Sequence, residues 1–301
     1  MNYYEEIKNE LINNEVYKKV KDYSKNRNDL ITYYNVGKLL IEAQGGEERA
    51  KYGNKLIKVY SKKLEIELGK KYNERTLRRM RQLYILFKNI KWSTLSTKLS
   101  WSHYQELLVL VNKYEIDYYI QETIKHNLTI RQLREKIKSK EYQRLDKNTK
   151  QKLILEERTG IDDFIKNPIV IRNTNNIENI SEKVLKKLIL EDIEHFMNEL
   201  GSGYSFIGSE YRIKIGNNYN YIDLLLFNIE FNCYVVIELK IVELKKEHIG
   251  QIEVYMNYLD KNLRNASQNK TIGIIICKKD NKFVMEYASD ERVYSRSYEL
   301  V

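Results

Sequence analysis

Apolar and polar positions follow different patterns in the two halves of the chain. In the first half, apolar residues recur every three to four positions, which is typical of helices that bury one face. The second half adds short runs rich in branched and aromatic residues, which favour strands, separated by helical stretches. The pattern predicts an all-helical region followed by an α/β region.

Glycine and hydroxyl residues punctuate the predicted helices of the first half. Gly45 and Gly46 end one helix, Gly69 is expected as a C-cap and Thr129 as an N-cap. The predicted helices span 7–23, 29–44, 50–69, a segment from Asn73, 102–113, 116–126 and 129–140. Trp92 and Trp101 flank a polar loop between them and are expected to anchor a core.

The chain length fits two domains that each bury a core. Residues 145–175 are mostly polar and charged and contain the single proline, Pro168. We therefore expect a basic helical domain over 1–150, a connecting segment over 151–176 and a second domain over 177–301.

Two consecutive apolar runs, 221–227 and 232–240, predict a buried hairpin. With its turn centred between Glu230 and Phe231, Asp223 lies directly opposite Glu238, and opposed residues have Cβ atoms about 4.5 to 5.5 Å apart. Side chains alternate along a strand, so Lys240 shares the face of Glu238.

Two carboxylates and an ammonium within an apolar sheet require compensation, because unpaired charges are costly to bury. A magnesium ion, which proteins usually bind through one or two carboxylates and several waters, would supply it. Lys240 could then hold or help deprotonate a water for attack on phosphorus. The alternative is an internal ion pair of Lys240 with Glu238 or Asp223 that has no further role.

A predicted helix over 246–263 follows the acidic strand and carries Gln251 and Tyr255 four residues apart, on one face. These side chains are suited to holding a nucleotide or a water beside a metal. Ordinary packing is the alternative for such a pair. An apolar strand over 271–277 comes next.

The order Asp, Glu-x-Lys, Gln-x-x-x-Tyr, apolar strand resembles the PD-(D/E)XK nuclease superfamily, and several segments resemble its YhcG-like family more closely. These segments are 199–208, 221–227, 236–240, 250–251 and 272–277, and in the first half Tyr52-Gly53, 77–82 and 101–103. The resemblance implies a helical domain of undefined function, then a restriction-endonuclease-like domain with a central mixed sheet flanked by helices.

By the same resemblance, Asp223 and Glu238 would be metal ligands, Lys240 the catalytic lysine, and Gln251 with Tyr255 the supporting catalytic pair. Ile222 precedes Asp223 where the superfamily's name has proline. An acid on the first helix of the nuclease core often completes the metal site in such enzymes. The helix predicted over 181–200 offers Glu182, Glu191, Asp192 and Glu194, beside Lys186 and Lys187. Glu191 is the preferred ligand among them, and most of these charges are expected on a solvated face.

Glu210, on the strand leading to Asp223, is a further acidic candidate, although an ordinary edge-strand charge is the simpler interpretation.

Charge is distributed unevenly between the halves. Residues 1–150 hold 32 Lys and Arg against 19 Asp and Glu, a net of +13, whereas residues 151–301 hold 20 against 23, a net of −3. A basic excess attracts phosphates without regard to sequence. The nucleic-acid-binding candidates lie on the helix from Asn73. Four of them share the face opposite its apolar side, Arg75, Arg78, Arg79 and Gln82, and Arg81 belongs to the same basic stretch. A solvated helix face that keeps the protein soluble is the alternative.

Other classes of function find little support. The N-terminus lacks the pattern of a signal peptide and no apolar stretch reaches the roughly 20 residues of a membrane span, so a cytoplasmic protein is expected. Cys233 and Cys277 fall in predicted buried strands, which suits reduced packing. The four histidines have no zinc-ligand spacing, and no glycine-rich phosphate loop is present.

We therefore expect a Mg²⁺-dependent DNA endonuclease, or one that acts on branched or damaged DNA, with a role in recombination, repair or defence and with Mn²⁺ able to substitute. By the superfamily resemblance, hydrolysis leaves a 3′ hydroxyl and a 5′ phosphate. A homodimer would suit cutting of two strands. Two alternatives stay open: a nucleic-acid-binding protein whose nuclease fold is a docking module, and a partner-dependent subunit of a restriction or defence assembly that is inactive alone.

Overall fold

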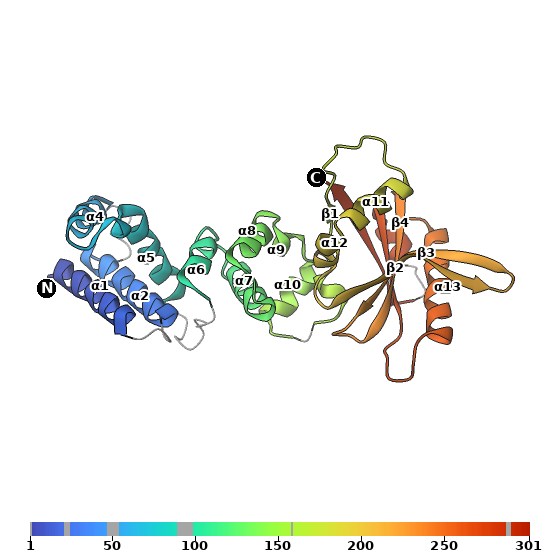
Figure 1. The fold of residues 1–301 in the computed structure, drawn as a ribbon, viewed down its shortest axis with the longest axis horizontal. Coiled ribbons are helices and arrows are strands. Elements are labelled where there is room, and N and C mark those ends of the chain that lie inside the picture. Colours follow the sequence, from blue (N-terminus) through green and yellow to red (C-terminus); the bar gives the residue numbers. More distant parts are fainter. Residues whose placement is uncertain (1, 21–24, 47–53, 89–98, 158, 287–289) are drawn as a thin grey trace. The chain divides into compact units, whose positions relative to one another are not determined.

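The computed structural model describes residues 2–20, 25–46, 54–88, 99–157, 159–286 and 290–301. The chain divides into two compact units, Met1–Tyr142 and Gln143–Val301 (Figure 1). Much of the expected connection over 151–176 is part of the second unit, because Ile169 and Ile171 are buried in its core and form a strand there. None of the described helices is long and apolar enough to cross a bilayer.

The first unit is helical, as the sequence predicts. Its described elements are α1 (Tyr3–Val20), α2 (Lys25–Ala43), α4 (Asn54–Leu68), η2 (Lys70–Tyr72), α5 (Glu74–Phe87), α6 (Trp101–Leu107), α7 (Lys113–His126) and α8 (Ile130–Lys138), with α9 (Glu141–Arg144) at the unit boundary. Tyr52, Gly53 and Trp92 lie outside the described residues. Trp101 packs on Tyr33 with ring centroids 4.9 Å apart.

Local capping chemistry explains where these helices begin and end. Asn73 accepts from the Thr76 amide, and Thr129 and Gln132 form a capping box at the start of α8. The helix predicted over 102–113 is wrong in its second half: α6 ends at Leu107, because Asn112 accepts from the Tyr114 amide and starts α7. A polar cap there competes with helical periodicity.

Helix α5 packs its apolar side into the unit, with Leu77, Met80 and Leu83 buried. Its main neighbour is α2, and the two helices meet at Gly37. A Cβ at Gly37 would lie 2.1 Å from the Met80 carbonyl oxygen, so only glycine allows this close approach.

The described residues of the second unit form a six-stranded mixed sheet in the order β1-β6-β5-β4-β3-β2. Its strands are β1 (Ile169–Ile171), β2 (Tyr204–Ile215), β3 (Asn218–Asn228), β4 (Cys233–Glu243), β5 (Ile272–Lys279) and β6 (Val293–Leu300). Strands β2, β3 and β4 pair antiparallel, whereas β4, β5, β6 and β1 pair parallel.

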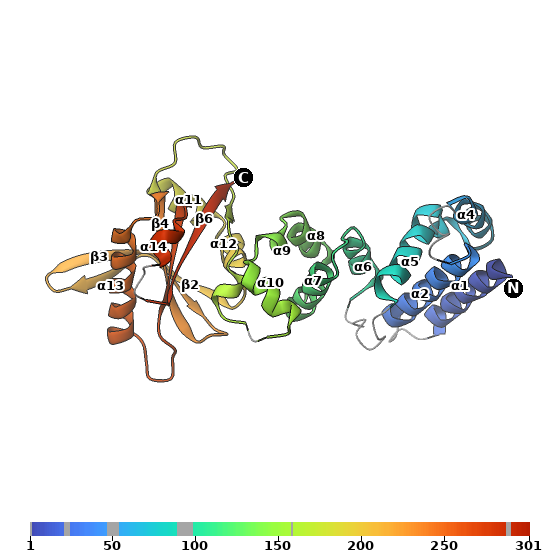
Figure 2. The ribbon, with the colours of Figure 1, turned by 180° about the vertical axis from the view of Figure 1, so that it is seen from behind.

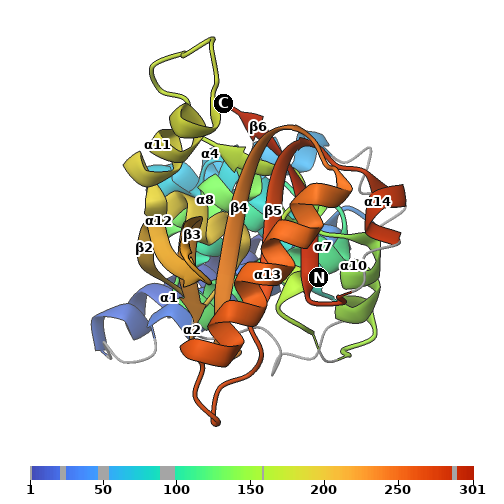
Figure 3. The same cartoon turned by 90° about the vertical axis from the view of Figure 1, so that its right-hand side faces the viewer.

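Helices cover both faces of this sheet (Figures 2 and 3). They are α10 (Lys147–Ile154), η3 (Asp162–Phe164), α11 (Glu182–Glu191), α12 (Ile193–Leu200), α13 (Lys246–Asn262) and α14 (Lys282–Glu286). The single helix predicted over 181–200 is wrong in one respect. It breaks at Asp192, which leaves helical geometry and accepts from the His195 amide to cap α12.

Two apolar layers hold the sheet between its helices. On one face, Leu185, Leu188 and Phe196 from α11 and α12 pack on Ile237 and Leu239 of β4. On the other face, α13 packs on the alternate residues of the same strands. That second layer includes Ile252, Tyr255, Met256, Leu225, Val236 and Ile275. Cys233 and Cys277 are buried free thiols, as predicted.

One buried ion pair ties α9 to α12 in this unit. Arg144 donates to both carboxylate oxygens of Glu199, whose side chain is 3% exposed and also accepts from the Val170 amide. Burial raises the pKa of Glu199, but the hydrogen bonds and charge of Arg144 lower it overall.

We expect Arg144→Gln to lower the free energy of unfolding by about 3 kcal/mol, because it leaves a buried carboxylate without its cation. Arg172→Gln is the matched control, since Arg172 pairs with Asp192 at 2.7 Å on the surface and should cost less than about 1 kcal/mol. Urea unfolding of the full chain would measure both. Equal losses in the two variants would contradict this ranking.

Candidate active site

Strands β3 and β4 separate at the two acids named from the sequence. Backbone pairing runs from Asn228–Cys233 to Leu224–Ile237, so the next opposed residues are Asp223 and Glu238, in the predicted register. At these residues, hydrogen bonds from backbone amides to side-chain carboxylates replace the backbone hydrogen bonds between the strands. The Leu239 amide donates to Asp223 Oδ2 at 3.0 Å, and the Asp223 amide lies 3.5 Å from Glu238 Oε1.

Strand β3 also changes face at this point. Ile222 packs in the α13 layer and Leu224 in the opposite layer, although residues two apart on a regular strand share one face. On the adjoining strand, Glu210 has a φ of 48°, in the left-handed region that non-glycine residues rarely adopt. Asp223 therefore departs from the regular alternation of β3, and its carboxylate meets β4 at the Leu239 amide.

Glu238 is the most deeply buried member of the site, at 1% exposure. Burial and the nearby Asp223 raise its pKa to about 7, against the opposing effect of Lys240. The Lys240 Nζ lies 3.3 Å from Glu238 Oε2. The chain thus holds a carboxylate whose negative charge is only partly compensated, which is a favourable location for a cation.

Lys186 of α11 provides a cation that sequence reasoning missed. Its Nζ donates to Asp223 Oδ1 and to Glu210 Oε1, each at 2.9 Å, and its side chain is 14% exposed. Burial lowers the pKa of Lys186, but the two carboxylates outweigh it and raise the pKa overall. Only the tertiary contact of α11 with the sheet shows this role, because helical periodicity places Lys186 among other surface charges.

Helix α13 lines the same face of β4 as Glu238 and Lys240, since Val236 and Tyr255 share one core layer. Gln251 Nε2 donates to the hydroxyl of Tyr255 at 3.0 Å, so the two predicted supporting residues contact each other. His248, three residues before Gln251, was not singled out by the sequence. Burial lowers the pKa of His248, and the charge of Lys240 lowers it further.

The acids of the first core helix occupy different places. Glu191 ends α11, is 44% exposed and lies 3.8 Å from Lys187, so its role as a metal ligand stays a prediction. Asp192 caps α12 and pairs with Arg172, and Glu194 is exposed. Glu182, at the start of α11, is close enough to raise the pKa of His248.

The donor set fits a hard divalent cation held by two carboxylates. Among the described residues, no group of three or more His, Cys, Asp or Glu side chains is arranged to hold a metal. Asp223 and Glu238 would leave the remaining coordination positions to water, the backbone or a substrate oxygen, which is the usual situation for magnesium. Lys186 already holds its ammonium against Asp223, so a cation at this carboxylate would share it with Lys186.

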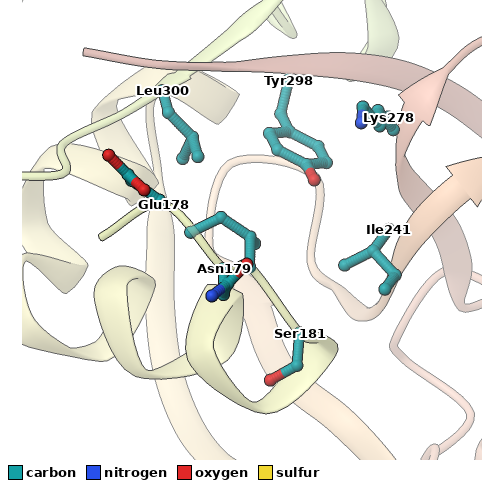
Figure 4. Close-up of a pocket in the computed structure, with 8 residues that line it drawn as sticks. Glu178, Asn179, Ser181, Ile241, Lys278, Tyr298 and Leu300 are labelled. Atoms are coloured by element: carbon teal, nitrogen blue, oxygen red, sulfur yellow. The ribbon is translucent and has the colours of Figure 1, made fainter. Parts of the chain in front are cut away.

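A cavity of about 740 Å³ lies beside the start of α11, and none of the residues that line it is Asp223, Glu238 or Lys240. Figure 4 shows Tyr298 and Ile241 facing each other across it. Ile241 belongs to the α11 side of the sheet, and Lys240 precedes it on β4. The cavity therefore adjoins the acids across the sheet and is a separate feature.

The nucleic-acid-binding candidates of α5 differ in their surroundings. Arg75 is exposed. The other four donate within the unit, Arg78 to Glu74, Arg79 to Gln105, Arg81 to Gln44 and Gln82 to the Leu108 carbonyl. Burial lowers the pKa of Arg79 and of Arg81. These contacts anchor helices of the first unit, so a role in binding nucleic acid stays a prediction.

A fork of β3 and β4 lined by Asp, Glu-x-Lys and Gln-x-x-x-Tyr, within a mixed sheet covered by helices, defines a nuclease fold of the PD-(D/E)XK class. Residues 162–298 match the model of the YhcG PDDEXK nuclease domain, and residues 9–144 match that of the DUF1016 N-terminal domain. The chain therefore combines a DUF1016 N-terminal domain with a YhcG-type PDDEXK nuclease domain.

Relatives and solved structures give the range of similarity. The protein YhcG of Escherichia coli (strain K12) is 26% identical over 294 residues, covering 85% of this chain and 78% of that protein. A repair endonuclease from Pyrococcus abyssi matches with a TM-score of 0.30 and 20% identity, and an EndoMS complex with double-stranded DNA with 0.30 and 19%. Each covers 40% of this chain, which spans about half the length of those solved chains.

The raised pKa of Glu238 predicts a pH dependence of the protein without metal. A raised carboxyl pKa stabilises the fold below the unfolded value, and that contribution is lost as pH rises through about 7. Glu238→Gln should therefore remove a decline in stability of about 3 kcal/mol between pH 4.5 and 7.

Urea unfolding in EDTA at several pH values would measure this decline. Glu243→Gln, on the exposed end of the same strand, should keep the wild-type profile. An unchanged profile in Glu238→Gln would contradict the burial of a charged carboxylate.

Proposed function

We propose that this protein is a Mg²⁺-dependent endonuclease that cleaves DNA. The observation that carries the proposal is the end of β3–β4 pairing at Asp223, Glu238 and Lys240, because two acids and one amine lie together there and the buried Glu238 is only partly compensated. Mn²⁺ should substitute, since both ions accept oxygen ligands in similar geometry.

Each residue has a defined task in this proposal. Asp223 and Glu238 would hold the cation, which when bound polarises the phosphate and makes a neighbouring water more acidic. Lys240 lies beside Glu238 and orients the attacking water through its ammonium. Tyr255 is 6% exposed and accepts from Gln251, and this pair would hold the face of α13 that contacts the substrate. Hydrolysis would leave a 3′ hydroxyl and a 5′ phosphate.

DNA is supported as substrate by charge. The net charge of +13 in residues 1–150 supplies attraction to a polyanion, whereas residues 151–301, which contain Asp223 and Glu238, have a net charge of −3. Grip by one domain and cleavage by the other is the arrangement that this imbalance favours. Roles in recombination, repair or defence, a homodimer, and a cytoplasmic location belong to the same proposal.

Activity on supercoiled plasmid and linear duplex in Mg²⁺ tests the proposal. We expect Asp223→Asn and Lys240→Met each to lower cleavage by about a hundredfold or more, because each removes a group that acts on the reacting atoms. Glu243→Gln is the control with an unchanged rate. Cleavage that persists in both site variants would refute the assignment. Tight DNA binding without cleavage by the wild type would favour a docking module or a subunit that needs a partner.

Lys186 should compete with the cation for Asp223. Lys186→Gln is therefore expected to tighten Mn²⁺ binding about tenfold, since it removes a positive charge from the opening. Lys187→Gln makes the same charge change on the exposed side of α11 and should alter affinity less than about twofold. Titration calorimetry would measure both.

A second comparison separates two roles for Glu210. If Glu210 only retains Lys186, Glu210→Gln should have no effect on Mn²⁺ affinity once Lys186→Gln is present. If Glu210 is itself a ligand, Glu210→Gln should weaken Mn²⁺ binding both in the wild type and in Lys186→Gln. Equal Mn²⁺ affinity of wild type and Lys186→Gln would contradict the competition.

A further inference from the structure

The β2–β3 hairpin carries an exposed row of cations and aromatic rings that the catalytic proposal does not use. Four side chains form this row, which we call the hairpin ladder: Arg212, Lys214, Tyr219 and Tyr221. Tyr219 and Tyr221 are 55% and 53% exposed. Both strands continue directly from the site, since Tyr221 precedes Asp223 by two residues.

The register brings the members of the ladder together. Arg212 pairs with Tyr221, and Lys214 pairs with Tyr219. The Arg212 guanidinium carbon lies 4.9 Å from the centroid of the Tyr219 ring, and the Lys214 Nζ lies 5.9 Å from it. The opposite side of the hairpin is anchored, because Ile213 and Ile222 pack in the α13 layer. The ladder is therefore a fixed outward face.

The charge of this face points to an anionic partner. Residues 211–222 contain two basic residues and no acid, within a half of the chain that is otherwise acidic. Cross-strand contacts between cations and rings stabilise a hairpin, but that role alone does not require two tyrosines to remain more than half exposed. Exposed rings interleaved with cations are the combination by which proteins bind single-stranded nucleic acid.

Distance along β3 places the ladder beside the reacting phosphate. At about 3.3 Å per residue, Tyr221 lies about 7 Å and Tyr219 about 13 Å from Asp223. The Asp223 carboxylate accepts from Lys186 of α11, so it is reached from the side of the sheet that faces away from α13, which is also the side of the hairpin ladder. Nucleotides that adjoin a phosphate at Asp223 would therefore extend along β3 toward both rings. In a duplex the base faces are stacked within the helix, so the rings select nucleotides that are not paired.

We propose that the hairpin ladder binds unpaired nucleotides next to the cleaved phosphodiester, so that the enzyme acts where a strand is single or branches from a duplex. The position of the bound nucleotides beside the cleaved bond rests on the proposed nuclease function. Tyr219 and Tyr221 stack on bases, and Arg212 and Lys214 neutralise the adjoining phosphates.

Fluorescence anisotropy with a labelled single strand and a duplex of equal length tests the ladder, in EDTA so that no cleavage occurs. The double variant Tyr219→Ala and Tyr221→Ala should bind the single strand at least about tenfold more weakly, with the duplex changed less than twofold. Changing both residues to Phe should retain binding, because stacking uses the ring. Tyr114→Ala is the control, an exposed tyrosine of the first unit.

The Phe pair also guards against a hairpin that fails to fold, since it keeps the packing of both rings. Equal losses for single strand and duplex, no loss in the Ala pair, or a wild type that binds no single strand would each overturn the ladder. Cleavage assays on the same proteins separate the two proposals. If the wild type binds single strands through the ladder but cleaves nothing, only the proposed nuclease function is refuted. If the wild type cleaves DNA but the Ala pair binds single strands as well as the wild type, only the role of the ladder is refuted.

Discussion

The active centre depends on a carboxylate kept in an apolar sheet. Glu238 is buried at the point where β4 loses its antiparallel neighbour, and its charge is disfavoured there by burial and by Asp223. Two lysines from different elements, Lys240 and Lys186, offset part of that cost. The fold thus leaves the buried Glu238 carboxylate only partly stabilised, and a bound cation would add to what the two lysines supply.

The sheet supplies the geometry that the charges need. Strand β4 pairs in parallel with β5 and packs between two helical layers, whereas its antiparallel pairing with β3 ends at Leu224 and Ile237. The Asp223 carboxylate accepts a hydrogen bond from the Leu239 amide of β4, where a backbone carbonyl would accept it in a regular strand pair. Backbone pairing of β3 with β4 therefore stops at Leu224 and Ile237, and Asp223 and Glu238 are the first opposed residues beyond it.

Local sequence predicted the β3–β4 hairpin, its register and the opposition of Asp223 to Glu238, because turn position and alternation determine pairing within a hairpin. It did not predict Lys186 or His248 at the site, since both depend on how helices pack on distant strands. The break at Asp192 was missed because apolar periodicity continues through it and only the cap interrupts the helix. Likewise, the contacts of Arg79 and Arg81 with residues of other segments left no trace in the spacing of α5.

Glu210 illustrates how local stability and chemistry can conflict. Its left-handed backbone suits glycine, and a non-glycine residue there costs of order 1 kcal/mol. Glycine would relax the strand but would delete the carboxylate that holds Lys186. A search for more thermostable versions of this protein would thus be drawn to position 210, and success by that route would leave Lys186 paired with Asp223 alone.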